Sequence, residues 1–197
     1  MARTAKHPIR QVCYDRFVAS AKKTNSEKGE SYHLVYCEFI RYFAQLERIT
    51  IHEFIIGSHF IYGWMPTMLT LSKPTEYEKA VGILNLAREG KAISDQELLQ
   101  LTTFVNNSLI GVSKLLHFIR PDKFAIWDSR VCKFIYDRQI AESPENGVKR
   151  YMAYLDNCKN LANHTDFNLV HSDICNKIGF EISPFRAIEW VMYMQGK

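Results

Sequence analysis

Apolar side chains recur at three- and four-residue steps through most of this chain, and that spacing restricts it to a helical fold. In residues 7–23 the positions of Ile9, Val12 and Phe17 follow the helical period, and residues 32–46 repeat the pattern. We find no convincing pair of stretches that alternate apolar and polar residues as half-buried strands do. The sequence therefore predicts an all-α protein.

Capping residues divide this helical pattern into segments. Thr50 with Glu53, and Ser94 with Glu97, have the spacing of capping boxes, in which each end of the pair bonds the backbone of the other. Asn106 begins a turn of the kind that tolerates left-handed backbone. The predicted helices are 7–23, 32–46, 51 onward with a break between Gly63 and Pro66, 73–89, 95–104, a short one after Gly111 that ends at Arg120 and Pro121, one headed by Trp127 and Asp128 that ends at 140, 143–158, 166–178 and 183–194.

The length of 197 residues and the hydrophobic share of 47% are enough for a sizeable core. No long linker interrupts the pattern. We predict one domain, residues 1–197, of about ten helices, either in one compact body or in two apposed lobes.

Charge and composition narrow the function classes. The net charge of +4 permits a polyanionic partner without demanding one. Neither a signal peptide nor a membrane span is present in the pattern, so we expect a soluble cytoplasmic protein. The five cysteines never form a C-x-x-C pair and fall in apolar helical patterns, so we expect buried thiols, no metal site and no cofactor. They are Cys13, Cys37, Cys132, Cys158 and Cys175.

An acidic residue at a predicted helix start is the main chemical feature. Asp128 heads the helix that comes after the stretch from Gly111 to Arg120, and backbone N–H groups there favour its carboxylate form. Such a residue is either a helix cap alone or a reactive acid. Lys114 lies fourteen residues earlier, in the first turn after Gly111, and offers an amine.

Two short runs in this region resemble a known family. The run LIGVSK at 109–114 resembles the hairpin pattern L-P-G-V-G-x-K of the helix-hairpin-helix DNA glycosylases, and AIWDSRV at 125–131 resembles their A-V-D-x-H-V run. Within that superfamily the chain looks most like the 8-oxoguanine DNA glycosylase-like branch. The resemblance implies an all-α fold in two lobes around a helix-hairpin-helix-like element, here within residues 106–140.

The resemblance also implies roles for individual residues. Asp128 would activate water or stabilise the oxocarbenium-like sugar while the bond to a flipped-out base breaks. Backbone amides of the hairpin would hold a DNA phosphate. The partner would be duplex DNA with a modified base, bound by a monomer without metal or cofactor. The residues implied in DNA binding are Gly111, Val112, Ser113, Arg120, Lys123 and Arg130.

The chain departs from the family pattern in two ways. Its hairpin has one glycine instead of two, and the interval from Lys114 to Asp128 is shorter by roughly four residues, about one helical turn. If that turn was lost beyond the lysine, Lys114 is the amine that forms a Schiff base in bifunctional glycosylases. If the alignment is counted back from Asp128, Ile110 takes the lysine position, and the enzyme is monofunctional.

A glycosylase needs a pocket whose walls stack on the extruded base. Candidates are aromatic residues beside the expected helix break, a histidine on the face of Lys114, and residues of the last helix; core packing is the alternative for each. They are Tyr62, Trp64, His117, Glu189 and Trp190.

The sequence thus favours a DNA N-glycosylase, in base excision repair or in defence against modified invading DNA. A second reading is a nucleic-acid-binding protein that retains the fold without the chemistry. The third is a helical interaction module in which Asp128 is only a cap.

Overall fold

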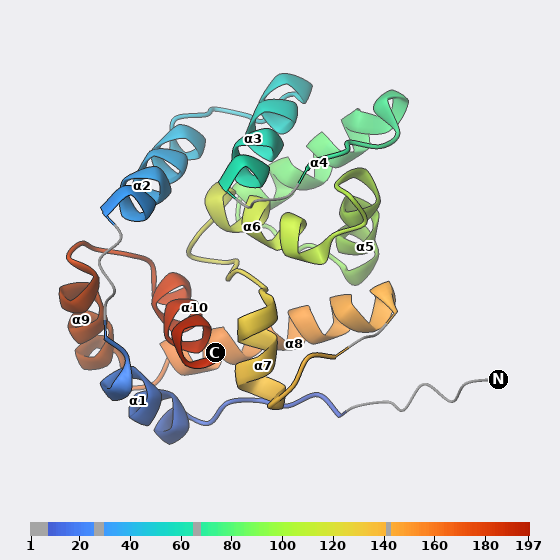
Figure 1. The fold of residues 1–197 in the computed structure, drawn as a ribbon. Helices are drawn as coiled ribbons and strands as arrows, with labels where there is room; N and C mark the ends of the chain where they lie inside the picture. The colour runs from blue at the N-terminus through green and yellow to red at the C-terminus, as the bar shows by residue number, and fades with distance from the viewer. Residues whose placement is uncertain (1–7, 26–29, 65–67, 141–142) are drawn as a thin grey trace. The chain divides into compact units, whose positions relative to one another are not determined.

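The computed structural model describes residues 8–25, 30–64, 68–140 and 143–197, and the side chains of residues 30–32 are not described. Helices are the regular structure of these residues, with one isolated antiparallel bridge between Leu71 and Val105 (Figure 1). The all-α prediction is confirmed. The elements are α1 (Tyr14–Lys23), α2 (Glu30–Ala44), α3 (Ile51–Trp64), the 3-10 turn η1 (Pro74–Glu76), α4 (Tyr77–Arg88), α5 (Asp95–Phe104), α6 (Leu109–Ile119), α7 (Ser129–Tyr136), α8 (Pro144–Ala162), α9 (Phe167–Ile178) and α10 (Pro184–Gln195).

The chain divides into two compact units. Unit 1 is discontinuous and combines Met1–Ser26 with Trp127–Lys197, whereas unit 2 is the continuous segment Glu27–Ile126. Each unit has its own core, and the residues of interest are distributed between them. Asp128 belongs to unit 1 and Lys114 to unit 2.

Helix α6 is the centre of unit 2. It packs against α2, α3, α4 and α5, and eight of its eleven residues are buried (Figure 1). A short helix with apolar residues on nearly every side is stable only when neighbouring helices cover it. Its surroundings include the fully buried aromatic rings of Phe54 and Phe104.

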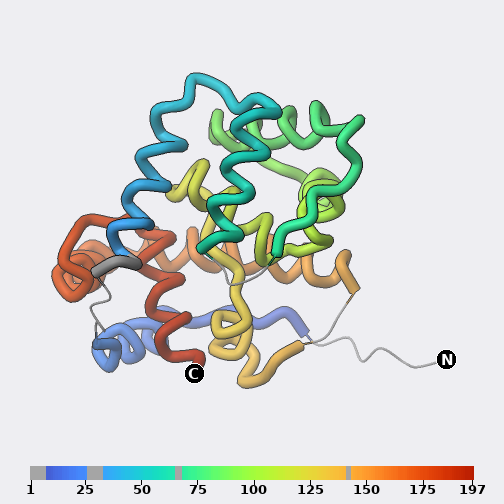
Figure 2. Tube along the Cα trace, turned by 45° about the horizontal axis from the view of Figure 1, so that its top comes forward, coloured from blue at the N-terminus to red at the C-terminus, as the bar shows by residue number. Residues whose placement is uncertain are grey.

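Helix α10 has the corresponding place in unit 1. It packs against α1, α7, α8 and α9 (Figures 1 and 2), and Ile188, Val191 and Met192 are fully buried. After its N-cap Ser183, Pro184 occupies the first turn as the sequence predicts. The start of α7 is therefore supported by a buried helix.

Several predicted boundaries are confirmed and three are wrong, including the end of α8, which lies at Ala162 instead of residue 158. The capping box of Ser94 and Glu97 opens α5 as predicted. Helix α1 begins at Tyr14 instead of residue 7, because the Asn157 side chain accepts from Val12 N (2.8 Å) and donates to Val12 O (3.0 Å), which holds that backbone extended. Helix α7 ends at Tyr136 instead of residue 140, because Asp137 adopts a left-handed conformation with φ 61°.

The thiol prediction is correct for three of the five cysteines. Cys132, Cys158 and Cys175 are buried, but Cys13 is exposed and Cys37 is half-buried. Cys13 is the residue that precedes α1, outside the helix into which the periodicity had placed it. Among the described residues, no helix combines the length and apolarity that crossing a membrane requires. Pro66, where the sequence predicts a break, lies outside the described residues, and α3 ends at Trp64.

Candidate active site

Asp128 is the N-cap of α7. Its backbone is extended (φ −131°, ψ 159°), and its Oδ1 accepts from the Arg130 amide at 2.9 Å and, at 3.4 Å, from the Ser129 hydroxyl. Within the described part of the chain no hydrogen bond or ion pair reaches Oδ2. The residue is half-buried. The carboxylate therefore caps its helix with one oxygen and leaves the other available to a ligand or to water.

The end of α10 supports the first turn of α7. The Arg130 guanidinium carbon lies 4.7 Å from the centre of the Tyr193 ring, a cation–π contact that orients an exposed cation two residues after Asp128. A Cβ atom on Gly196 would lie 2.7 Å from the Arg130 carbonyl carbon, so only glycine fits there without movement. Lys133 Nζ donates to Lys197 O at 2.6 Å.

The two predicted pocket residues of α10 lie in the core of unit 1. Glu189 is 2% exposed and pairs with Arg186, three residues earlier on the same helix. Trp190 is 6% exposed. Burial and an ion pair within the helix agree with the core-packing alternative for both residues.

The turn before α6 differs from the glycine-led hairpin that the sequence predicts. Gly111 is the third residue of α6, and the left-handed positions of the turn are Asn106 (φ 53°) and Asn107 (φ 49°). The Ser108 hydroxyl accepts from Gly111 N at 3.1 Å, and the Ser108 carbonyl accepts from Val112 N at 3.0 Å. Since Ser108 already occupies these amides, they do not form the predicted phosphate site. The side chains of Val112 and Ser113 are fully buried as well.

Close packing explains why residue 111 is glycine. A Cβ atom built there would lie 2.9 Å from both Cζ and Cε2 of the Tyr62 ring, closer than real side chains approach one another. Tyr62 comes from α3, is buried, and has a pKa raised by that burial. The glycine thus allows α3 and α6 to approach closely, and Tyr62 is part of that helix contact.

Lys114 and Trp64, predicted for different roles, lie side by side in unit 2. The Lys114 ammonium nitrogen is 5.6 Å from the centre of the Trp64 ring, and both residues are half-buried. Trp64 also packs edge-on against Phe118, with ring centres 5.4 Å apart. The structure thus brings a predicted catalytic amine and a predicted pocket residue together in this unit.

His117 is a satisfied core residue. It is fully buried, its Nδ1 lies 2.7 Å from the Phe124 carbonyl oxygen and its Nε2 lies 3.0 Å from the Tyr36 hydroxyl. A carbonyl can only accept, so Nδ1 carries a proton and donates it to Phe124, and Nε2 shares a hydrogen bond with the Tyr36 hydroxyl. The prediction that His117 lines a base pocket is wrong, and the core alternative is confirmed.

The predicted cations after α6 differ in their surroundings. Arg120 is the C-cap of α6, pairs with Asp122 at 2.9 Å and donates to the Arg88 carbonyl at 3.2 Å, so part of its function is to link α6 to α4. Lys123 is exposed. Of the residues predicted to bind DNA, Arg120, Lys123 and Arg130 stay candidates, whereas the amides of α6 do not.

No family model, curated protein or solved structure matches this chain.

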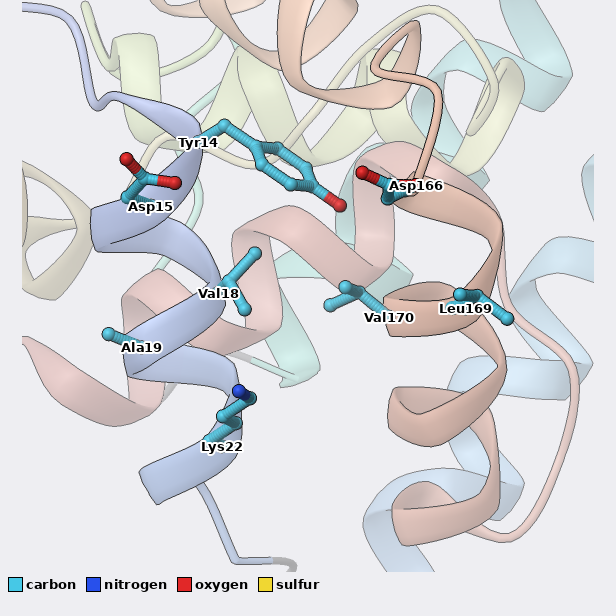
Figure 3. A pocket seen from close by; sticks show the side chains of 8 residues that line it. All are labelled: Tyr14, Asp15, Val18, Ala19, Lys22, Asp166, Leu169 and Val170. Atoms are coloured by element: carbon cyan, nitrogen blue, oxygen red, sulfur yellow. The ribbon is translucent and has the colours of Figure 1, made fainter.

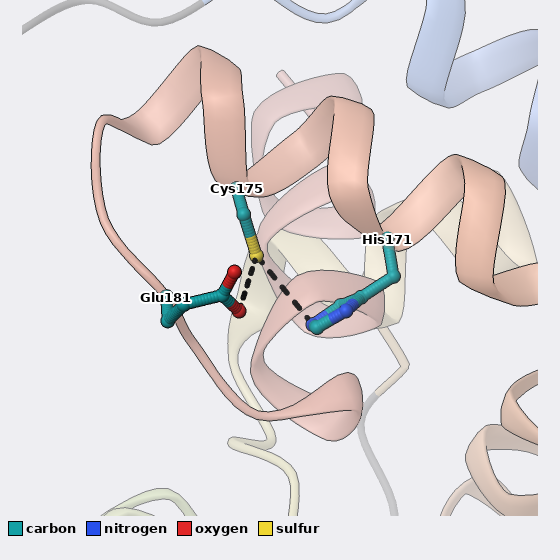
Figure 4. Close-up of side chains that lie close together, drawn as sticks. All are labelled: His171, Cys175 and Glu181. Atoms are coloured by element: carbon teal, nitrogen blue, oxygen red, sulfur yellow. Dashed lines mark hydrogen bonds between the residues drawn. The ribbon is translucent and has the colours of Figure 1, made fainter.

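Two features were missed from the sequence, and both lie in unit 1. A surface groove of about 400 Å³ runs between α1 and α9 (Figure 3), where Tyr14 stacks on His164 with ring centres 3.5 Å apart. Its lining residues come from two segments far apart in the sequence, and no residue spacing predicts that the segments meet. The second is a cluster of His171, Cys175 and Glu181 (Figure 4). Its sequence signal was the four-residue step between a histidine and a cysteine on one helix.

Proposed function

We propose that this protein is a DNA glycosylase that hydrolyses the N-glycosidic bond of a modified base, with Asp128 as the essential acid. The observation that carries the proposal is the Asp128 carboxylate, which caps α7 through Oδ1 and whose Oδ2 accepts no hydrogen bond from the residues that the structure describes. A residue that was only a cap would serve equally well as serine, the residue that caps α5, α6, α8 and α10. The aspartate adds a negative charge at the start of α7, and the proposed reaction uses that charge.

The proposed reaction needs one carboxylate and one water molecule. The base leaves with the electron pair of its bond to C1′, and the positive charge that develops on the sugar is stabilised by the negative charge of Asp128. Water then adds to C1′, and its proton passes to the Asp128 carboxylate or to the departing base. The products are a free base and an abasic site, and no cofactor takes part.

DNA would be bound through exposed cations. Arg130 is held by Tyr193 two residues from the acid, and Lys123 is exposed in unit 2. Contacts of lysine and arginine with phosphates position DNA without reading its sequence. They carry the DNA-binding proposal in place of the α6 amides.

The capping role of Asp128 determines the test. Asparagine caps a helix about as well as aspartate, so Asp128→Asn removes the charge and keeps the cap, whereas Asp128→Ala removes both. Duplexes with oxidised, alkylated or heavily modified bases are incubated with protein, and alkali then cuts at abasic sites. We expect Asp128→Asn to reduce cleavage by about 10²–10⁴-fold with an unchanged melting temperature.

The matched control is Asp137→Asn, at the other end of α7. Asp137 is also an acid, and asparagine tolerates its positive φ. Loss of the Asp137 charge should leave cleavage unchanged. If no modified duplex is cut and salt-dependent binding remains, the protein is a nucleic-acid-binding protein without chemistry. If neither cleavage nor binding is found, Asp128 is only a cap.

A second route is favoured by the contact between Lys114 and Trp64. In that route the Lys114 amine displaces the base at C1′ and loses a proton, and the sugar ring then opens at the C1′–O4′ bond, with O4′ protonated, to give an imine. Borohydride reduces this imine to a stable protein–DNA bond. Trapping that disappears in Lys114→Gln while α6 remains folded would assign a bifunctional enzyme. We expect the monofunctional route, with cleavage only after alkali and no trapped adduct.

A further inference from the structure

Three side chains with metal-binding atoms converge at the end of α9 in unit 1. Cys175 Sγ lies 3.6 Å from His171 Nε2 and 3.5 Å from Glu181 Oε2, and the three atoms lie within 4.8 Å of one another (Figure 4). Cys175 is buried, His171 is half-buried and Glu181 is exposed, so the cluster is open on the carboxylate side.

The two separations from Cys175 are those of neighbouring ligands around a tetrahedral cation. Zinc binds thiolate sulfur at about 2.3 Å and imidazole nitrogen or carboxylate oxygen at about 2.0–2.2 Å, so neighbouring ligand atoms lie about 3.4–3.6 Å apart. The two distances from Cys175 meet that value without any movement of the backbone. Thiolate and imidazole ligands favour zinc over the hard cations calcium and magnesium.

The local fold brings the ligands together through one helix and one turn. His171 and Cys175 are four residues apart on α9 and share a face of it. Gly179 ends the helix with φ 97°, a conformation that reverses the chain and returns Glu181 to Cys175. In the metal-free protein His171 Nε2 donates to the Ile182 carbonyl oxygen at 2.8 Å, and binding of a cation at Nε2 would replace this hydrogen bond.

We propose that His171, Cys175 and Glu181 form a binding site for one zinc-class divalent cation, which would join the end of α9 to the segment that leads into α10. The proton balance of binding is explicit. The Cys175 thiol loses one proton to solvent, and the imidazole moves its proton from Nε2 to Nδ1, so one proton is released for each cation bound. A fourth position remains for water or for the Ile182 carbonyl oxygen.

The main alternative for a cysteine beside a histidine is a reactive thiolate. Here the Cys175 thiol donates to the Glu181 carboxylate at 3.5 Å, which places a negative charge beside the sulfur. A nucleophilic cysteine needs the opposite surroundings. The arrangement of the three ligands therefore suits a cation better than covalent catalysis.

The test uses Co²⁺ as the probe, because cobalt bound by a thiolate has a charge-transfer absorption in the near ultraviolet. Titration of the full-length metal-free protein should saturate at one equivalent and release one proton. The melting temperature should rise with metal concentration and return to its starting value with a chelator. Zn²⁺ should displace Co²⁺ and remove the absorption.

Variants separate this site from adventitious binding. Cys175→Ser should remove the absorption, and Glu181→Gln, a change at an exposed residue that leaves folding intact, should weaken Co²⁺ binding at least tenfold. Cys13→Ser is the matched control, because Cys13 is an exposed thiol outside the cluster. No charge-transfer band in the wild type, or an equal band in Cys175→Ser, would overturn the proposal. Neither outcome depends on DNA cleavage.

Discussion

The helices α6 and α7 both start with a polar cap, and they differ in the exposure of the residues after that cap. Ser108 opens α6, the next two residues Leu109 and Ile110 are half-buried, and Gly111 and Val112 after them are buried within unit 2. Asp128 opens α7, and Ser129 and Arg130 after it are exposed. The first start is closed by neighbouring helices, whereas the second is open.

This difference shows that a cap and a binding site share one sequence signal. Both starts offer backbone N–H groups that the helix itself does not use. At α6 the cap residue Ser108 binds these N–H groups, and the core covers the residues that carry them. At α7 the Asp128 carboxylate binds one N–H group with Oδ1, and the residues next to it are exposed. Burial of the first turn, more than the cap residue, decides which start can act on a ligand.

The largest expected effect on stability comes from a change in α10, the helix that packs against α7. Glu189→Leu leaves the buried Arg186 guanidinium without its carboxylate, and breaking a buried pair costs about 3–5 kcal/mol. Hydrogen exchange in α10 and α7 should accelerate while α6 stays protected. The double variant Arg186→Met/Glu189→Leu should recover most of the loss, and equal instability of both proteins would contradict this account.

The next largest effect tests how closely α3 packs against the start of α6. Gly111→Ala places a methyl group against the Tyr62 ring and should cost about 1–3 kcal/mol, measured by urea unfolding. Gly82→Ala is the control, because Gly82 is an exposed α4 residue whose Cβ would meet no atom within 4 Å. There, alanine should stabilise the protein by about 0.5–1 kcal/mol. A neutral Gly111→Ala would show that the start of α6 is looser than the structure indicates.

A smaller effect compares the caps directly. Ser108→Ala and Asp128→Ala should each cost about 1 kcal/mol, since each removes a side-chain acceptor for a helix amide. Asp128→Ser should then be nearly neutral in urea unfolding and still lack cleavage. An active Asp128→Ser protein would mean that the cap, without its charge, is the whole role of this residue.

The smallest effect concerns pH at the α5 start. Bonds from the Ser94 amide and hydroxyl hold the pKa of Glu97 below its ordinary value of 4.5. A carboxyl with a lowered folded-state pKa stabilises the protein above its ordinary pKa, and this contribution is lost as pH falls through the folded value. Glu97→Gln should therefore reduce the fall in melting temperature on acidification below pH 4.5, and an identical fall would contradict it.

Local signals predicted what local interactions determine. The caps Ser94 and Ser183 and the turn at Asn106 depend on residues a few positions away, and all three were predicted correctly. The late start of α1 was not predictable, because the side chain that holds Val12 extended belongs to Asn157, far along the chain.

The candidate site divides in the same way. Asp128 was found because a helix cap is a local pattern, and its capping bond is confirmed. Gly111 was misinterpreted as a turn residue, because the reason for glycine is a ring from α3. The partners of His117 come from α2 and from the segment after α6, and no spacing in the sequence relates them.

Because unit 1 is discontinuous in sequence, the two units fold in a fixed order during synthesis. Unit 2 is one uninterrupted segment and can fold as soon as it has been made, since domains generally fold as units during synthesis. The first helix of unit 1 must wait for α9 and α10, against which it packs and which are made roughly ten to thirty seconds later at ordinary elongation rates. During that interval Phe17 and Ala21, which are buried in the finished protein, have no core to join. Newly made α1 is thus a stretch that a chaperone can bind until the last helix emerges.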